Sequence, residues 1–114
     1  MNIPACFTLE EGMRLMPVEN DTMEPTLRSG DAVGVVPVDR FRGEGVYVIE
    51  SGGFPLIFRC RHERNGRIFL WRDNKRYSTL DLSLEEFNDC ILAEVHLVCR
   101  WLVTPSAANV REGV

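Results

Sequence analysis

The 114 residues carry a formal charge of −4, with 45% hydrophobic and 26% charged residues, a balance that favours one globular domain over a disordered chain. No apolar run is long enough to span a membrane and no secretory signal pattern is present, so we expect a cytoplasmic protein. The negative charge argues against direct nucleic-acid binding by this chain, and five arginines between positions 59 and 72 are interpreted as a solvated face.

In chain order, we expect an N-terminal arm at residues 1–17, one domain at 18–103 and a flexible tail at 104–114. Thr8 and Glu11 have the spacing of a capping box, which predicts a single helical turn in the arm. Runs rich in β-branched and aromatic residues predict strands at 14–19, 32–38, 45–50, 56–61, 68–71 and 91–102.

Turn and capping signals separate these strands. Gly52-Gly53 and Asn65-Gly66 predict two hairpins, and Ser83 with Glu86 forms a second capping box that predicts a helix at 84–88. The last strand is expected to place alternate residues from Ile91 to Trp101 on one apolar face. The predicted fold is therefore mostly β: a strongly bent sheet or open barrel of short strands with one or two short helices.

The four cysteines bear on metal and redox chemistry. None of them forms a Cys-x-x-Cys pair, which argues against a zinc ribbon or a redox motif. We expect neither a metal ion nor a cofactor.

The most informative segment reads Val18-Glu19-Asn20-Asp21-Thr22-Met23-Glu24-Pro25-Thr26-Leu27-Arg28-Ser29-Gly30-Asp31. It resembles the C-terminal peptidase domain of LexA, UmuD and the self-cleaving phage repressors, which carry a Gly-Asp-Ser-Met-Glu-Pro-like loop followed by a Gly-Asp turn and an apolar strand. Further on, Asn74-Lys75-Arg76-Tyr77 resembles the Asn-x-x-Tyr step of that family. The resemblance covers residues 18 to 101 and implies a LexA C-terminal-domain-like fold.

The resemblance also implies a serine nucleophile activated by a lysine on a later strand, and this chain departs from both. Thr22 stands at the serine position and Phe58 at the lysine position; a shift of one residue would place Arg59 there instead. Period-2 alternation favours Phe58, because it shares an apolar face with Leu56 and Cys60. Neither phenylalanine nor arginine can remove a proton from the hydroxyl.

Other groups are weak substitutes for the missing base. Lys75, the only lysine, lies in a polar loop where it stays protonated, and His62 and His96 are expected to have surface or packing roles. The Ala-Gly or Cys-Gly bond that the family cleaves is also absent. We therefore expect a pseudo-peptidase with no catalytic residue, in which Thr22 and Phe58 occupy vestigial positions.

The resulting hypothesis is a non-catalytic domain that mediates dimerisation or protein association in transcriptional regulation. We expect Met23, Glu24, Pro25 and Phe58 to form its binding surface, and a homodimer or a related regulator domain as partner, without nucleic acid or membrane. The alternative is a peptidase that cleaves itself or a partner using Thr22 and an unrecognised base. A third interpretation treats the loop as a mere turn in an unrelated β domain.

Overall fold

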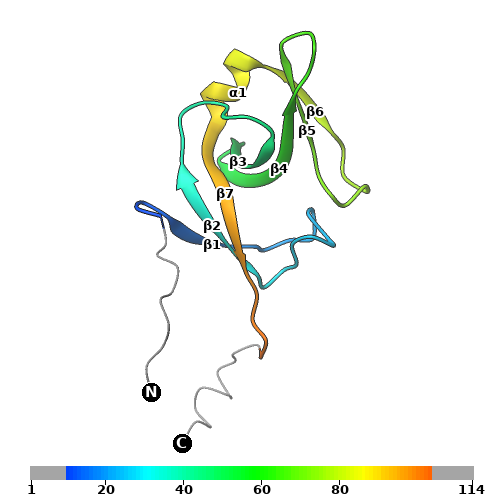
Figure 1. Ribbon diagram of the computed structural model, residues 1–114. Helices are drawn as coiled ribbons and strands as arrows, with labels where there is room; N and C mark the ends of the chain where they lie inside the picture. Colours follow the sequence, from blue (N-terminus) through cyan, green and yellow to red (C-terminus); the bar gives the residue numbers. More distant parts are fainter. Residues whose placement is uncertain (1–9, 104–114) are drawn as a thin grey trace, which may run out of the picture.

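The computed structural model describes residues 10–103, which form one antiparallel sheet and a short helix (Figure 1). The strands are β1 (Arg14–Pro17), β2 (Ala32–Pro37), β3 (Gly45–Ser51), β4 (Phe54–His62), β5 (Arg67–Trp71), β6 (Leu80–Ser83) and β7 (Ile91–Cys99). Their order in the sheet is β1-β2-β7-β3-β4-β5-β6, so β1 and β6 are edges and the barrel stays open. The predicted bent, mostly β fold is confirmed, whereas the predicted turn at Thr8 and the tail at 104–114 lie outside the described residues.

The two hairpins form where glycine signals predicted them. Ser51 pairs with Phe54 across Gly52-Gly53, and β4 pairs with β5 across the Asn65-Gly66 turn. Gly66 has a φ of 82°, a conformation that side chains with a Cβ rarely adopt. The two turns place β3, β4 and β5 next to one another in the sheet.

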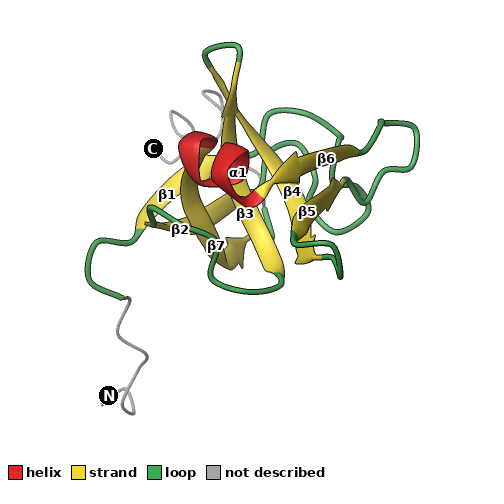
Figure 2. Cartoon of the chain, turned by 90° about the horizontal axis from the view of Figure 1, so that it is seen from above, coloured by secondary structure: helices red, strands yellow, loops and turns green. Residues whose placement is uncertain are grey.

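The helix α1 (Leu84–Cys90) covers one end of the sheet, as Figure 2 shows from above. It begins with the predicted capping box: the Ser83 hydroxyl accepts from the Glu86 amide, and the Glu86 carboxylate accepts from the Ser83 amide. Its buried Phe87 packs edge-on against Tyr47, with ring centroids 5.4 Å apart. One hydrophobic side chain thus attaches the helix to β3.

The core lies on both faces of the central strands. Val48 and Ile57 belong to a cluster on the side of β1 and β2, whereas Tyr47 and Phe58, their immediate neighbours, belong to a cluster beneath α1. Burial of both faces explains why β3 reads as an uninterrupted apolar run instead of an alternating one.

Strand β7 differs from its prediction in length and in alternation. It ends at Cys99 instead of 102, and Ile91 and Ala93 are buried while Leu97 and Cys99 are exposed. The pairing register with β2 shifts between Gly34 and Val35, which turns the later residues to the opposite face. A single apolar face along the whole strand was therefore wrong.

Two further differences concern the sheet edges. β6 has no predicted counterpart, because its four residues carry only two leucines and a weak alternation. At the other edge, the strand predicted at 14–19 is present as β1 but ends at Pro17, and it pairs with β2 along all of Arg14–Pro17. The β1 edge borders the groove described below.

Candidate functional site

The loop of residues 20–25 leads from β1 towards β2 and is fixed from within. Met23 is buried, with 1% of its surface exposed, and its carbonyl accepts a hydrogen bond from the Leu27 amide at 2.9 Å. The Glu24 amide donates to the Asp21 carbonyl at 3.2 Å, and the Glu24–Pro25 peptide bond is cis. Met23 therefore anchors the loop in the core, while Glu24 and Pro25 stay at the surface.

A second segment, the polar turn after β5, holds the same loop from outside. The Asn74 amide donates to the Thr22 carbonyl at 3.0 Å, and Asn74 Nδ2 donates to the Asp21 carbonyl at 3.0 Å. The Tyr77 hydroxyl donates to Asp21 Oδ1. The Asn-x-x-Tyr step identified in the sequence is thus the structural support of the loop.

In the part of the chain that the structure describes, the Thr22 hydroxyl contacts an amide oxygen and not a base. Its Oγ1 donates to Asn20 Oδ1 at 2.8 Å, and the same amide oxygen accepts from the Thr22 backbone amide at 3.2 Å. An amide oxygen does not take up a proton near neutral pH, so this contact orients the hydroxyl without making it nucleophilic. Among residues 10–103, this is the only hydrogen bond of the Thr22 hydroxyl.

Phe58 fills its position with a buried ring. It is 1% exposed and packs in the cluster beneath α1, on the face that alternation predicted. The guanidinium carbon of Arg72 lies 4.5 Å from the centroid of this ring and 5.3 Å from that of Tyr77. Burial lowers the pKa of Arg72, but a guanidinium remains charged in proteins and cannot act as a base.

A family model described as Peptidase S24-like matches residues 3–95 of the sequence. The chain belongs to this family. A search of curated proteins finds no match. Membership confirms the resemblance to the LexA and phage-repressor peptidase domains and excludes the interpretation of the loop as a chance turn in an unrelated β domain.

The alternative bases of this S24-like chain are engaged elsewhere or exposed. His96 Nε2 lies 2.8 Å from Glu94 Oε1 and its Nδ1 contacts Glu10, and these carboxylates raise the pKa of His96. The His62 ring lies beside Phe41, with centroids 6.2 Å apart. Lys75 is exposed. None of the three is a hydrogen-bond partner of Thr22.

Two ion pairs lie near the segment that follows the loop. The Asp73 carboxylate accepts from Arg59 Nε at 2.6 Å and from Thr26 Oγ1; burial works in the opposite direction, but these contacts hold the pKa of Asp73 below its ordinary value. Asp31 accepts from Arg100 Nε at 2.9 Å and Nη2 at 2.7 Å, and this bidentate pair lowers the pKa of Asp31 to about 2. Both pairs join residues far apart in sequence.

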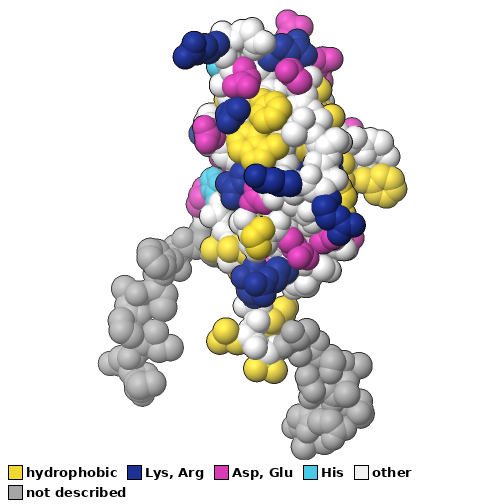
Figure 3. Space-filling view, turned by 90° about the vertical axis from the view of Figure 1, so that its right-hand side faces the viewer, with side chains coloured by type: hydrophobic (Ala, Val, Ile, Leu, Met, Phe, Trp, Pro, Cys, Tyr) yellow, Lys and Arg dark blue, Asp and Glu magenta, His cyan; other side chains and the backbone are white. Residues whose placement is uncertain are grey.

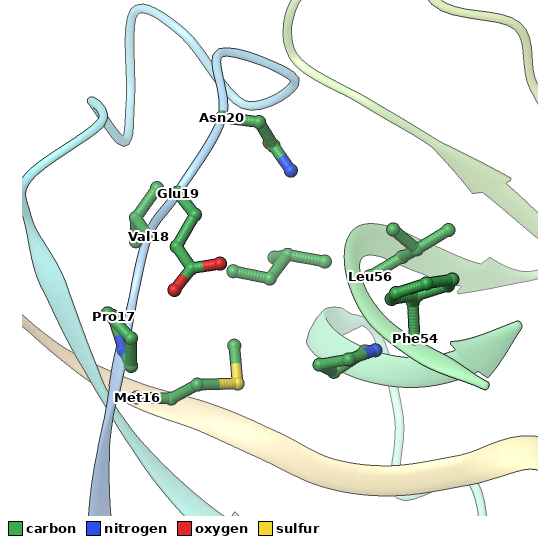
Figure 4. Close-up of a pocket in the computed structure, with 9 residues that line it drawn as sticks. Met16, Pro17, Val18, Glu19, Asn20, Phe54 and Leu56 are labelled. Carbon is green, nitrogen blue, oxygen red and sulfur yellow. The ribbon is translucent and has the colours of Figure 1, made fainter.

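A groove of about 370 Å³ lies beside the loop, between residues 16–20 and the start of β4 (Figure 4). The Glu19 carboxylate and the Met16 side chain project towards Phe54 and Leu56 on the opposite wall. The Val18 amide donates a hydrogen bond to the Asp31 carbonyl, and the Val18 carbonyl accepts one from the Gly30 amide. Because successive residues of an extended chain direct their backbone groups to opposite sides, the amide and carbonyl of Glu19 point away from β2. On the opposite wall, the outer edge of β4 has no neighbouring strand before Arg59, because β4 pairs with β5 only from Arg59 to His62.

The structure distributes the four predicted binding residues between core and surface. Met23 and Phe58 are buried and lie in different core clusters, whereas Glu24 and Pro25 are exposed. Sequence reasoning missed Arg72, which covers the Phe58 ring. The strand register could have indicated this contact. Arg59 pairs with Trp71, so Phe58 and Arg72 would form the next pair if the antiparallel register continued.

Two negative observations complete the site. In the part of the chain that the structure describes, no helix is long and apolar enough to cross a membrane. Residues 10–103 also hold no group of three or more His, Cys, Asp or Glu side chains arranged to bind a metal ion.

Proposed function

We propose that this S24-like chain is a non-catalytic domain that mediates protein association in transcriptional regulation. One observation carries the proposal: the Thr22 hydroxyl is bonded to an amide oxygen, while the position expected for its base holds a buried phenyl ring. Hydroxyl nucleophiles need a neighbouring base to react with a peptide bond. A supported loop without a base is consistent with a retained scaffold.

The groove supports association with an extended segment. Its walls are two strands with unpaired edges, β1 and the first half of β4. Four antiparallel steps separate these strands in the sheet, so they run in the same direction. A segment running the opposite way would therefore form antiparallel ladders with both, a mode of recognition by strand addition.

Exposed apolar side chains at the far end of β7 support self-association. Val98, Trp101, Leu102 and Val103 are exposed, and Leu15 on β1 is 61% exposed. A cluster of exposed large hydrophobic side chains is uncommon on a monomer and typical of an interface. We infer that two copies, or one copy and a related regulator domain, associate through this end.

Mass spectrometry tests the absence of catalysis. The protein is incubated at neutral and alkaline pH beside Thr22→Ala, and we expect both to keep their intact mass. A shorter product that forms from the unchanged protein and not from Thr22→Ala would establish the peptidase alternative instead.

Light scattering coupled to size-exclusion chromatography tests association. We expect a dimer whose dissociation is promoted by Leu102→Lys, with Leu92→Lys as the matched control because Leu92 is an exposed leucine of β7 near α1. A strict monomer at high protein concentration would refute self-association.

Peptide selection tests the groove separately. Peptides of about nine residues, the length of a long strand, are selected for binding from a random library. We expect Leu56→Arg, in the groove wall, to abolish binding of the selected peptides, and Leu80→Arg, at the opposite edge of the sheet, to preserve it. Equal losses in both variants would argue against the groove.

A further inference from the structure

A second, larger groove of about 650 Å³ lies on the other side of the loop. The loop residues Pro25 and Thr26 form one side, and the outer face of β4 and β5 with the turn after β5 forms the rest. Figure 3 views the molecule from the side of β5 and β6 and shows hydrophobic and cationic side chains next to one another on this face. This surface shares no lining residue with the groove beside Glu19.

The floor of this groove is aromatic. Phe69 and Trp71 are two residues apart on β5 and therefore point to the same face, with ring centroids 5.6 Å apart and ring planes inclined by 23°. The guanidinium carbon of Arg61, on the neighbouring strand, lies 5.2 Å from the Phe69 ring and 5.3 Å from the Trp71 ring. The guanidinium lies over both rings, so the three side chains form one cationic, aromatic cluster.

The charges that line the groove are predominantly positive. Its carboxylate, Asp73, is occupied by the bidentate contact of Arg59 and by Thr26. Arg61, Arg72 and Lys75 remain as lining cations; Arg61 has Glu63 at 3.4 Å on its outer side. The formal charge of −4 averages over the whole chain, and charges more than about 10 Å away are largely screened at physiological salt.

We propose that this groove binds a short stretch of single-stranded nucleic acid, with bases stacked on Phe69 and Trp71 and phosphates near Arg61 and Lys75. Single-strand binding proteins combine a cationic groove with aromatic side chains on which successive bases stack. An acidic peptide would use the cations and leave the rings without a matching partner. A duplex keeps its bases stacked internally and would leave the rings unused as well.

Fluorescence of Trp71 tests the stacking. The chain contains two tryptophans, so Trp101→Phe makes Trp71 the sole reporter. Titration with an unlabelled oligothymidine of about twelve nucleotides, within the range that single-strand sites cover, should quench this fluorescence. In the same background, anisotropy of a labelled oligothymidine should rise on binding, and Phe69→Leu should weaken binding about tenfold, as loss of one stacking partner does. Phe54→Leu, which removes an exposed ring outside the groove, should leave affinity unchanged.

Salt dependence tests the cations. Release of counterions by phosphate contacts at Arg61 and Lys75 predicts that log Kd rises with log salt concentration with a slope of about 1.4, and Lys75→Gln should reduce this slope by about 0.7. Arg40→Gln is the matched control, because Arg40 is exposed and outside the groove. Three results would overturn the proposal: no binding at low salt, binding without quenching of Trp71, or equally tight binding of the duplex or of poly-glutamate.

Discussion

The loop at residues 20–25 and the position of Phe58 on β4 keep different parts of the S24-like pattern. Hydrogen bonds support the loop: Asn74 donates to the carbonyls of Asp21 and Thr22, and the Tyr77 hydroxyl donates to the Asp21 carboxylate. At Phe58, where the resemblance leads us to expect the base, a phenyl ring lies buried in the core. The comparison indicates that the shape of the site is kept by hydrogen bonds that do not depend on its chemistry.

The largest expected effect is at Phe58, which belongs to the core. Phe58→Ala should lower the free energy of unfolding by about 3–5 kcal/mol, because it leaves a cavity among buried side chains. Urea denaturation measures the change. Phe54→Ala, at an exposed position of the same strand, should change stability by no more than about 0.5 kcal/mol. Similar losses in the two variants would mean that Phe58 does not serve the core.

A smaller effect is expected where the loop is held. Asn74→Ala removes the donor to the Asp21 carbonyl and should destabilise the chain by about 1–2 kcal/mol. Hydrogen exchange should also become faster at the amides of Glu24 and Leu27, whose partners lie in the loop. Lys75→Ala, an exposed neighbour, is the control. Unchanged exchange in Asn74→Ala would show that the loop keeps its shape without this support.

The third prediction concerns the pH dependence of the ion pair between Asp31 and Arg100. The pKa of Asp31 is about 2 in the folded protein, below its ordinary value of 3.8, because the Arg100 side chain and the Arg28 backbone amide donate hydrogen bonds to its carboxylate. The pair therefore stabilises the fold above the ordinary pKa, and this contribution is lost as pH falls from there towards the folded value. Melting temperature should fall over this range, and Arg100→Gln should flatten the fall. Identical profiles for the two proteins would contradict the assignment.

The sequence predicted those parts of the molecule that local patterns determine. Ser83 and Glu86 indicated the helix, Asn65-Gly66 indicated a hairpin, and the order of residues in the loop indicated the family. Alternation placed Phe58 on the buried face, which the structure confirms. Each of these signals lies within a few residues of the feature that it predicts.

Features that depend on contacts between distant residues could not be predicted in this way. Arg100 is 69 residues from Asp31, and nothing local marks either as a partner. The shift between Gly34 and Val35 arises from pairing with β7, so the sequence of β7 alone suggested one continuous apolar face. The second groove likewise needs the loop and β5 to be brought together.

The smallest expected effect separates two threonines of one loop region. Thr22→Ala removes a bond to Asn20, two residues away and exposed, and should change the free energy of unfolding by no more than about 0.5 kcal/mol. Thr26→Ala removes a bond to Asp73, 47 residues away, and should cost about 1 kcal/mol, because that bond ties the loop to the turn after β5. Chemical denaturation of both variants gives the comparison. A greater loss of stability for Thr22→Ala would contradict this expectation, because it would show that the Thr22 hydroxyl stabilises the fold more than the contact between Thr26 and Asp73 does.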